Sequence, residues 1–396
     1  MIEIAERSRI RAAPRRAESQ PIAFLRRLDW VLMAATFALV GYGLWVVSGI
    51  TRFDVPGDES YYVVRQAIAA GLGVAGLAVA MLVPADLARR HWRIVYGATL
   101  GLMVVVFLAA ETIRGSKRWI DLGFIQFQPS ELGKVLFVLA IAGFLVERAG
   151  RITRWRTILS ALGLGAVPIL LVFLQPDLGT ALVYGAALMA SLFFVGVRWR
   201  QLAALLVAVL FVALSVLWIL PSAGIEVLKP YQTDRLTGLL DRDLDPSGIT
   251  WNVNQSMTAV GAGGLTGRGI VEASQTRLDY LPEHATDFAF ASLAEQRGFV
   301  GSSILLLLYL LVVWRGLRVI TVAGDLYGAV VAGGLVFALM FQVFVNVGMT
   351  MGVAPVTGIP LPFVAVGGSS LVTNLVLIGV LQGIHVRGLL AGRPAP

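Results

Sequence analysis

The chain has 396 residues, of which 57% are hydrophobic and only 14% are charged, with 32 Lys and Arg against 24 Asp and Glu. A soluble globular domain carries roughly 25% charged residues, so this composition excludes an ordinary soluble protein and predicts an integral membrane protein. The absence of cysteine excludes disulfides, thiolate catalysis and cysteine-ligated metals. The histidines, His91, His284 and His385, have no recognised metal-binding spacing.

Apolar runs long enough to cross a hydrocarbon core of about 30 Å recur along the whole chain. They predict an all-α polytopic membrane protein with about ten transmembrane helices, at residues 30–50, 64–83, 93–110, 132–147, 157–174, 178–196, 201–221, 298–314, 327–349 and 369–386. A polar, Gly-rich segment at 222–297 separates the seventh span from the eighth and is too long for an ordinary connection. We therefore expect a basic tail at 1–28, one membrane domain at 29–388 and a short tail at 389–396. The Arg-rich start lacks the apolar core of a cleavable signal peptide.

Lys and Arg gather at the termini and in alternate connections, for example at Arg89, Arg90, Arg148, Arg151 and Arg198. Cytoplasmic loops of membrane proteins carry such an excess, so we expect both termini on the cytoplasmic side of the membrane. The remaining connections then lie on the outer face, at 51–63, 111–131, 175–177, 222–297 and 350–368. The net charge of +8 therefore comes from basic connections and a basic tail that lie beside anionic lipid headgroups. We expect no nucleic-acid partner.

The end of the long outer segment, LPEHATDF at 281–288, is the leading candidate for a catalytic motif. A carboxylate that re-enters the bilayer is costly to desolvate, which makes Asp287 a functional candidate, and burial can tune such a group into a general base. In the alternative, Thr286 caps the next helix and Asp287 complements its dipole. Glu283, in a rigid turn after a proline, and the later acid Glu295 favour the functional interpretation.

Basic residues in the outer connection 111–131 run against the positive-inside trend. Lys117 and Arg118 there suit an anionic ligand, because Arg offers a planar fork for phosphate oxygens and Lys a point charge. The alternative is an interfacial anchor formed with the adjacent tryptophan.

Lys134 lies one turn into a predicted span and needs a partner, for which Glu131, Asp177 or an anionic substrate would serve. Asp177 follows a proline in a very short turn, where a structural role is as well supported as a ligand role. A Gly-dense stretch at 260–269 lacks nucleotide-binding spacing, which favours close backbone packing over a phosphate loop.

Taken together, these motifs resemble the SEDS family of bacterial cell-shape and division proteins, and its cell-elongation branch better than its division branch. The resemblance covers residues 25–386. Its carriers are GSKRWIDLGFIQFQPSELGK (115–134), QPDLGT (175–180), NVNQSMTAVGAGGLTG (252–267), the segment 281–301 and PVTGIPLPFVAVGGSSL (355–371). The chain departs from the family pattern at Ala285, where His is usual, at Gln296, where a second Glu is usual, and at Ala365-Val366, where Ser-Tyr is usual.

The resemblance implies a peptidoglycan glycosyltransferase that polymerises lipid II into glycan strands during cell elongation, by inverting displacement of undecaprenyl pyrophosphate. Asp287 falls on the essential acidic position and is expected to act as general base. The expected substrate-binding residues are Arg118, Lys134, Lys117, Glu131, Asp177, Glu283, Thr286 and Glu295.

The resemblance also implies partners: a class B penicillin-binding protein acting as transpeptidase, and other membrane proteins of the elongation complex. It leaves open a divalent cation, Mg²⁺ or Mn²⁺, and no organic cofactor is expected. Two other functions stay open on the sequence, a flippase for lipid-linked precursors and a non-catalytic scaffold for a cell-wall synthase.

Overall fold

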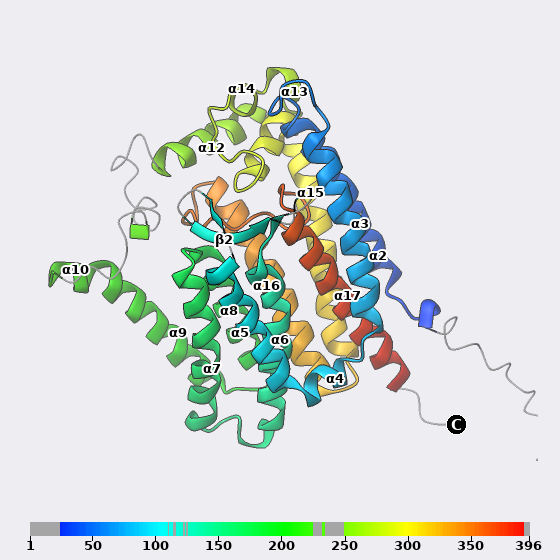
Figure 1. Cartoon of the computed structure of the whole chain (residues 1–396), viewed down its shortest axis with the longest axis vertical. Helices are drawn as coiled ribbons and strands as arrows, with labels where there is room; N and C mark the ends of the chain where they lie inside the picture. The colour runs from blue at the N-terminus through cyan, green and yellow to red at the C-terminus, as the bar shows by residue number, and fades with distance from the viewer. Residues whose placement is uncertain are drawn as a thin grey trace, which may run out of the picture.

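The computed structural model describes residues 24–109, 111–113, 116–121, 123, 126–224, 232–233 and 249–391. Most of the predicted N-terminal tail, the end of the C-terminal tail and most of 225–248 lie outside these residues. Figure 1 shows a bundle of long helices with short helices gathered at one end.

Each predicted span lies within or largely overlaps one long helix. These helices are α2 (Trp30–Ile50), α3 (Tyr61–Leu82), α5 (Trp92–Ala109), α6 (Pro129–Glu147), α7 (Trp155–Leu174), α8 (Leu178–Phe194), α9 (Trp199–Leu214), α15 (Ala289–Val322), α16 (Leu326–Thr350) and α17 (Gly368–Ala391). The largest difference is at α15, which is longer than predicted at both ends. Among the described residues, 8 helices are long and apolar enough to cross a membrane, with α9 counted together with its continuation to Ser222, and α5 and α8 are shorter apolar helices. The prediction of an all-α polytopic membrane fold is confirmed, and the long helices follow one another along the chain as the predicted spans do.

Two connections contain more structure than predicted. The outer connection after α5 forms a small antiparallel sheet of β1 (Glu111–Ile113), β2 (Ser116–Asp121) and β3 (Gln126–Phe127) in that order. The long segment holds α12 (Ile249–Gly263), α13 (Gly269–Glu272) and α14 (Ser274–Arg277). These short helices lie at the end of the bundle opposite α4 (Ala85–Arg90), as Figure 1 shows.

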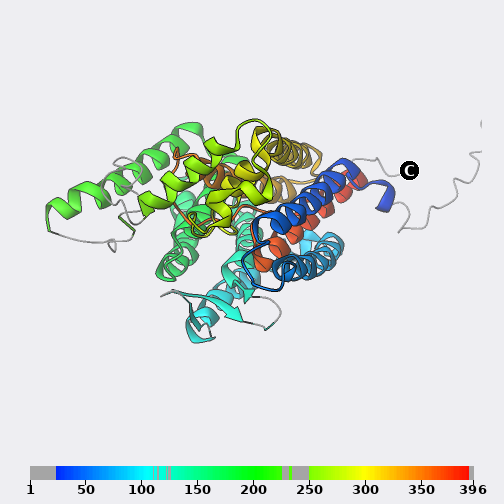
Figure 2. The same ribbon diagram turned by 90° about the horizontal axis from the view of Figure 1, so that it is seen from above.

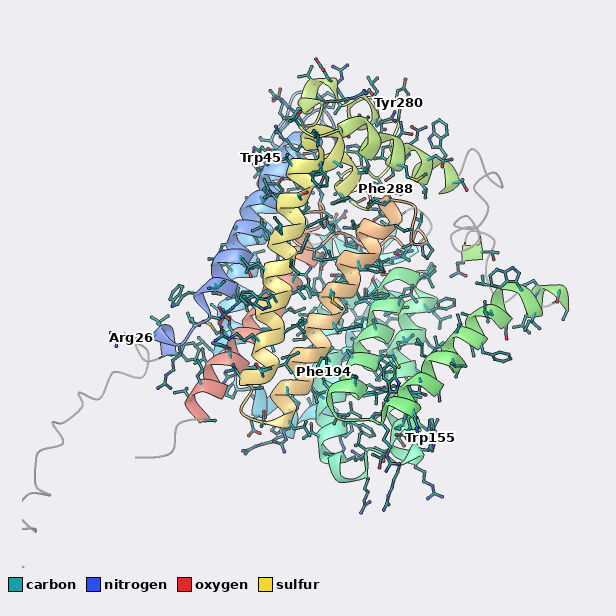
Figure 3. All side chains as sticks on the ribbon, turned by 180° about the vertical axis from the view of Figure 1, so that it is seen from behind. Arg26, Trp45, Trp155, Phe194, Tyr280 and Phe288 are labelled. Atoms are coloured by element: carbon teal, nitrogen blue, oxygen red, sulfur yellow. The ribbon has the colours of Figure 1, made fainter. Side chains whose placement is uncertain are left out.

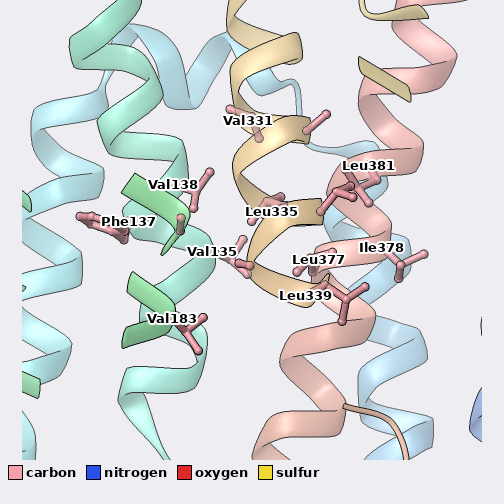
Figure 4. Packing of buried hydrophobic residues seen from close by; sticks show 14 of the residues in the cluster. Val135, Phe137, Val138, Val183, Val331, Leu335, Leu339, Leu377, Ile378 and Leu381 are labelled. Atoms are coloured by element: carbon pink, nitrogen blue, oxygen red, sulfur yellow. The ribbon is translucent and has the colours of Figure 1, made fainter. Parts of the chain in front are cut away.

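The core of the bundle is formed by α6, α8, α16 and α17. Figure 4 shows apolar side chains of these helices facing one another, including Val135 and Val183, Leu335 and Leu377. By contrast, α9 leans away from the other helices and continues through a π-helical turn (Ser215–Ile219) into α10 (Leu220–Ser222), as Figures 1 and 2 show. Only 11% of the most apolar stretch between Trp199 and Ser222 is buried inside the structure, so α9 presents an apolar surface suited to lipid.

The Gly-dense segment is a packing element. A side chain at Gly263 would overlap the Ala294 carbonyl of α15, and one at Gly267 would overlap the Gln296 carbonyl. Gly298, with φ of 63°, interrupts α15 opposite these glycines. The prediction of close backbone packing is confirmed, because only residues without Cβ allow this approach.

A buried ion pair fastens the other end of the bundle. Arg315 of α15 donates to Asp29, the N-cap of α2, at 2.6 and 2.9 Å, and the Gln382 amide of α17 exchanges hydrogen bonds with the Asp29 backbone. These bonds join α2, α15 and α17, which are distant in sequence, at the same end of the bundle.

Candidate active site

The segment 281–288 forms a compact turn between α14 and α15. Leu281 and Phe288 are buried and anchor its two ends, while Asp287 is half-buried between them. Phe288 and Thr286 donate their backbone N–H groups to the Glu283 carbonyl, each at 3.1 Å. Figure 3 shows Phe288 near Tyr280, at the end of the molecule opposite Trp155.

Thr286 is not the N-cap of the next helix. The N-cap of α15 is Phe288, whose side chain makes no capping hydrogen bond. Thr286 instead donates its hydroxyl to the Glu283 carboxylate at 2.9 Å, and Glu283 has a left-handed φ of 55°, a conformation that a non-glycine residue rarely adopts. Asp287 directly precedes the N-cap, so its charge is placed to complement the helix dipole whether or not it also acts as a base.

Distant elements hold the turn in place. The Asn346 amide of α16 donates to the carbonyl of Asp287 at 2.9 Å and to that of Ile359 at 2.8 Å. The Val366 N–H donates to the Ala285 carbonyl at 2.8 Å. Asn346 is fully buried, so its hydrogen bonds fix the Asp287 backbone without competition from water.

The connection 111–131 meets the 175–177 turn. Arg118 donates through Nε to the Gln175 carbonyl at 3.0 Å and through Nη2 to the Pro176 carbonyl, and its Nη1 lies 3.9 Å from Asp177. The Gln128 amide donates to the second Asp177 oxygen at 2.8 Å. Arg118, predicted to bind substrate, thus also holds the backbone of this turn.

Asp177 has a structural role. Its carboxylate accepts the Thr180 N–H at 3.1 Å and caps α8. Since the side chain is only 3% exposed and also binds Gln128, the structural interpretation of Asp177 accounts for its position.

Lys134 and Glu131 satisfy each other. The Lys134 ammonium lies 2.9 Å from both carboxylate oxygens of Glu131, and the two side chains are 7% and 1% exposed. Of the partners that the sequence left open for Lys134, the structure gives it Glu131. A buried pair of this kind is neutral overall, so each charge is compensated before any substrate binds.

Glu295 binds α14 and is not part of the Asp287 turn. Its fully buried carboxylate accepts hydrogen bonds from the backbone of Gln275 and Thr276 at 2.9 Å each and from the Thr276 hydroxyl at 2.7 Å. It fastens α14 to α15, and this geometry does not support the predicted substrate contact.

The Lys117 side chain lies outside the described residues.

The predicted outer connections meet at one end of the bundle. Val366 joins the Asp287 turn to the 350–368 connection, and Ser369, just beyond that connection, accepts the Gln128 N–H at 3.0 Å. Gln128 in turn binds Asp177, so the backbone of 366–369 and these hydrogen bonds connect the Asp287 turn with the Arg118 cluster, which is Arg118, Gln128 and the 175–177 turn. Within the described ranges, no three metal-binding side chains gather. The donor set therefore does not fit a protein-built metal cage.

Sequence reasoning missed Asn346, which holds the Asp287 backbone, and Gln128, which binds Asp177. It also missed Asp54, whose carboxylate lies 3.1 Å from the Nε2 of His284 in the Asp287 turn. Asn346 is a polar residue inside an apolar span, which is itself a signal of function. Asp54 and Gln128 give no such signal, because their partners are distant in sequence.

Comparison with known proteins decides the family. A model of the FtsW, RodA and SpoVE family, described as cell cycle proteins, matches residues 26–388. The chain belongs to this family. The peptidoglycan glycosyltransferase MrdB of Escherichia coli is 36% identical over 359 residues, which cover 90% of this chain and 94% of MrdB. Stage V sporulation protein E of Bacillus subtilis is 35% identical over 365 residues, covering 90% of this chain and 96% of that protein.

Solved structures agree with this relationship. The rod shape determining protein RodA of Thermus thermophilus matches with a TM-score of 0.66 and 29% identity over 90% of this chain and 96% of that chain. A chain from a study of how a peptidoglycan synthase complex coordinates polymerization and crosslinking matches with a TM-score of 0.76 and 32% identity, over 91% of this chain and 98% of that chain. The predicted family, multi-pass membrane fold and peptidoglycan glycosyltransferase activity are confirmed.

Proposed function

We propose that this chain polymerises lipid II at the outer face of the bacterial inner membrane, with Asp287 as the general base. The observation that carries this proposal is the setting of Asp287. It is half-buried and lies directly before α15, on a turn held by Asn346 and Val366.

The proposed step is a single inverting displacement. Asp287 takes the proton of the acceptor sugar hydroxyl as that oxygen bonds to the anomeric carbon of the donor. The bond from the anomeric carbon to the pyrophosphate oxygen breaks, and undecaprenyl pyrophosphate leaves with the electron pair. One base suffices, whereas retaining glycosidases need two closely spaced carboxyl groups.

Arg118 and Lys134 are the cations that we assign to the departing pyrophosphate. Each already has an internal partner, the 175–177 turn for Arg118 and Glu131 for Lys134. Both therefore stay ordered without substrate, and the pyrophosphate would share them with these partners. Lys117, Glu283 and Thr286 remain predicted substrate contacts, with Glu283 and Thr286 also shaping the Asp287 turn.

A divalent cation, Mg²⁺ or Mn²⁺, would take most of its ligands from the substrate phosphates. Mg²⁺ at such sites typically uses only one or two protein carboxylates. No chemical step proposed for this chain depends on it.

The orientation rests on charge. Arg89 and Arg90 lie on α4, which α5 separates from the connection that carries Arg118, and α6 separates that same connection from Arg148 and Arg151. Figure 1 places α4 at the end opposite α12–α14. By the positive-inside rule, we infer that this end and both termini face the cytoplasm.

We further propose a class B penicillin-binding protein as partner, together with other membrane proteins of the elongation complex. The similarity to a chain of a synthase complex that couples polymerization to crosslinking supports this inference.

The test is polymerisation of lipid II by purified protein with its transpeptidase partner in detergent. Wild type should form glycan strands, and Asp287→Asn should form none, while Asp58→Asn should match wild type. Asp58 is the control because it is an exposed carboxylate on the α2–α3 connection. Absence of polymer from the wild type would contradict the enzyme and favour a flippase. Polymer from Asp287→Asn at the wild-type rate would remove Asp287 from the mechanism.

A further inference from the structure

The imidazole of His284 lies between two carboxylates, in the same turn as Asp287. Its Nε2 is 3.1 and 3.2 Å from the two oxygens of Asp54, and its Nδ1 is 3.6 Å from an oxygen of Asp279. A neutral imidazole has one N–H donor, whereas an imidazolium has a donor on each nitrogen. The carboxylate within hydrogen-bond distance of Nε2 and the second negative charge near Nδ1 therefore both favour the charged ring.

The contact with Asp54 is the sheltered one. The His284 and Asp54 side chains are 12% and 20% exposed, whereas Asp279 is 80% exposed, so water screens the Asp279 contact far more. Asp54 belongs to the α2–α3 connection, 230 residues from His284. The pair thus joins two outer connections that nothing in the local sequence would bring together.

Other charged groups nearby are engaged elsewhere or carry the same sign as Asp54. On the α2–α3 connection, Arg52 pairs with Glu59 at 2.9 Å, and Asp58 accepts from Ser60. The Asp287 turn contributes the acids Glu283 and Asp287 themselves. From α15, the Ser292 hydroxyl donates to the His284 carbonyl at 3.2 Å and brings no charge.

Burial is the largest single influence on His284 and by itself would lower the pKa. The hydrogen bond to Asp54, the charges of Asp54 and Asp279 and a backbone hydrogen bond to Leu281 together outweigh it, so the pKa of His284 is raised above its ordinary value of 6.5. A raised pKa means that the ion pair is complete at low pH and is lost as the pH rises through the pKa of the folded protein.

We propose that Asp54 is a positioning residue for glycosyl transfer, which holds the His284 imidazolium and thereby fixes the turn from which Asp287 acts. The inference rests on the proposed function of Asp287. The bonds from Asn346 and Val366 to this turn join amides to carbonyls and do not titrate. The Asp54–His284 pair therefore makes the geometry of the turn depend on pH, and turnover should fall on the alkaline side.

The experiment measures kcat and KM for lipid II between about pH 5 and 9, where histidine changes charge. Asp54→Asn should lower kcat about tenfold or more with KM changed less than about threefold, and its alkaline fall should begin at lower pH. Asp54→Glu should recover part of the kcat. His284→Lys should keep its charge, so its alkaline fall should disappear. The matched control is Glu59→Gln, which removes an acid of the same connection that does not reach His284.

A second readout does not depend on catalysis. Hydrogen exchange of the peptide containing 281–288 should be faster in Asp54→Asn than in Glu59→Gln at the same pH. In the wild type its protection, relative to the intrinsic base-catalysed exchange rate, should fall at alkaline pH. A wild-type kcat and pH profile for Asp54→Asn, a change confined to KM, or equal exchange in the two variants would each overturn the positioning role. If Asp54→Asn behaves as wild type while Asp287→Asn is inactive, only this inference fails. A wild type that makes no polymer contradicts the proposed function instead, and the exchange measurement still decides the role of Asp54.

Discussion

At the scale of the residue, Asp287 and Glu295 are two acids of one segment in different surroundings. Glu295 is fully buried and accepts hydrogen bonds from Gln275 and Thr276, which satisfy its charge. Asp287 is half-buried, and Asn346 holds its backbone carbonyl. The proposed role of Asp287 in proton transfer needs a side chain that substrate can reach, whereas a fully buried carboxylate with several internal donors is suited to holding structure.

Glu295→Gln should therefore reduce stability and leave chemistry largely intact. The new amide would direct donor hydrogens toward N–H groups that now bind a carboxylate, which costs about 1–3 kcal/mol. We expect a lower unfolding temperature, with kcat per folded molecule within about threefold of wild type. Thermal unfolding and lipid II turnover check this, with the exposed Glu272→Gln on α13 as control. Full stability together with loss of turnover would return Glu295 to the substrate site.

The sequence points to a candidate base, Asp287, because an acid beside an apolar span is costly unless it has a use. That assignment stays a prediction, and the sequence did not indicate the residues that hold the turn. The roles of Asp54, Asn346 and Arg118 could not be predicted, since each depends on how elements far apart in the chain are placed against one another. For Arg118 the main partners are backbone carbonyls, which no residue pattern records.

At the scale of the element, the contact between α12 and α15 determines where the Asp287 turn lies. Hydropathy predicted a span from residue 298, but α15 begins at Ala289, because its first turns pack against α12 and α14 rather than against lipid. Gly263 is in contact with the Ala294 carbonyl in that part of α15. Periodicity locates apolar spans well, but it does not detect the part of a helix that is buried under a cap of other helices.

Two glycines of α12 offer a matched comparison. A Cβ at Gly263 would overlap the Ala294 backbone, whereas a Cβ at Gly261 would meet nothing within 4 Å. Gly263→Ala should destabilise the protein by about 1–3 kcal/mol through overpacking and should also lower turnover by shifting α15. Gly261→Ala should be neutral or slightly stabilising, because alanine favours a helix. Equal unfolding temperatures for the two variants would show that the α12–α15 contact is loose.

At the scale of the whole molecule, polar and basic residues divide between the two ends of the bundle. The Asp287 turn, the Arg118 cluster and the Asp54–His284 pair are connected at one end through the 350–368 connection. A flippase would need polar groups near the bilayer midplane that are accessible from both sides in turn. An enzyme that acts on a lipid-linked sugar needs its polar residues at one face of the membrane only, because the reacting bond lies at the interface while the lipid tail remains in the membrane.

The absence of native cysteine makes the orientation directly measurable. Asp58→Cys and Arg154→Cys place single thiols at exposed positions on the α2–α3 and α6–α7 connections. A membrane-impermeant thiol reagent should label the residue 58 variant in intact cells and the residue 154 variant only after permeabilisation. The reverse labelling would invert the topology and place Asp287 on the cytoplasmic side.

The most direct test of the central claim separates binding from chemistry in Asp287→Asn. General-base catalysis contributes typically 10²–10⁴-fold to a rate, about the loss expected here, whereas the amide still fills the same space. We predict that Asp287→Asn binds lipid II within about threefold of wild type and loses at least about 10²-fold in single-turnover bond formation. A variant that loses binding and turnover in equal measure, or that retains turnover, would contradict Asp287 as the general base.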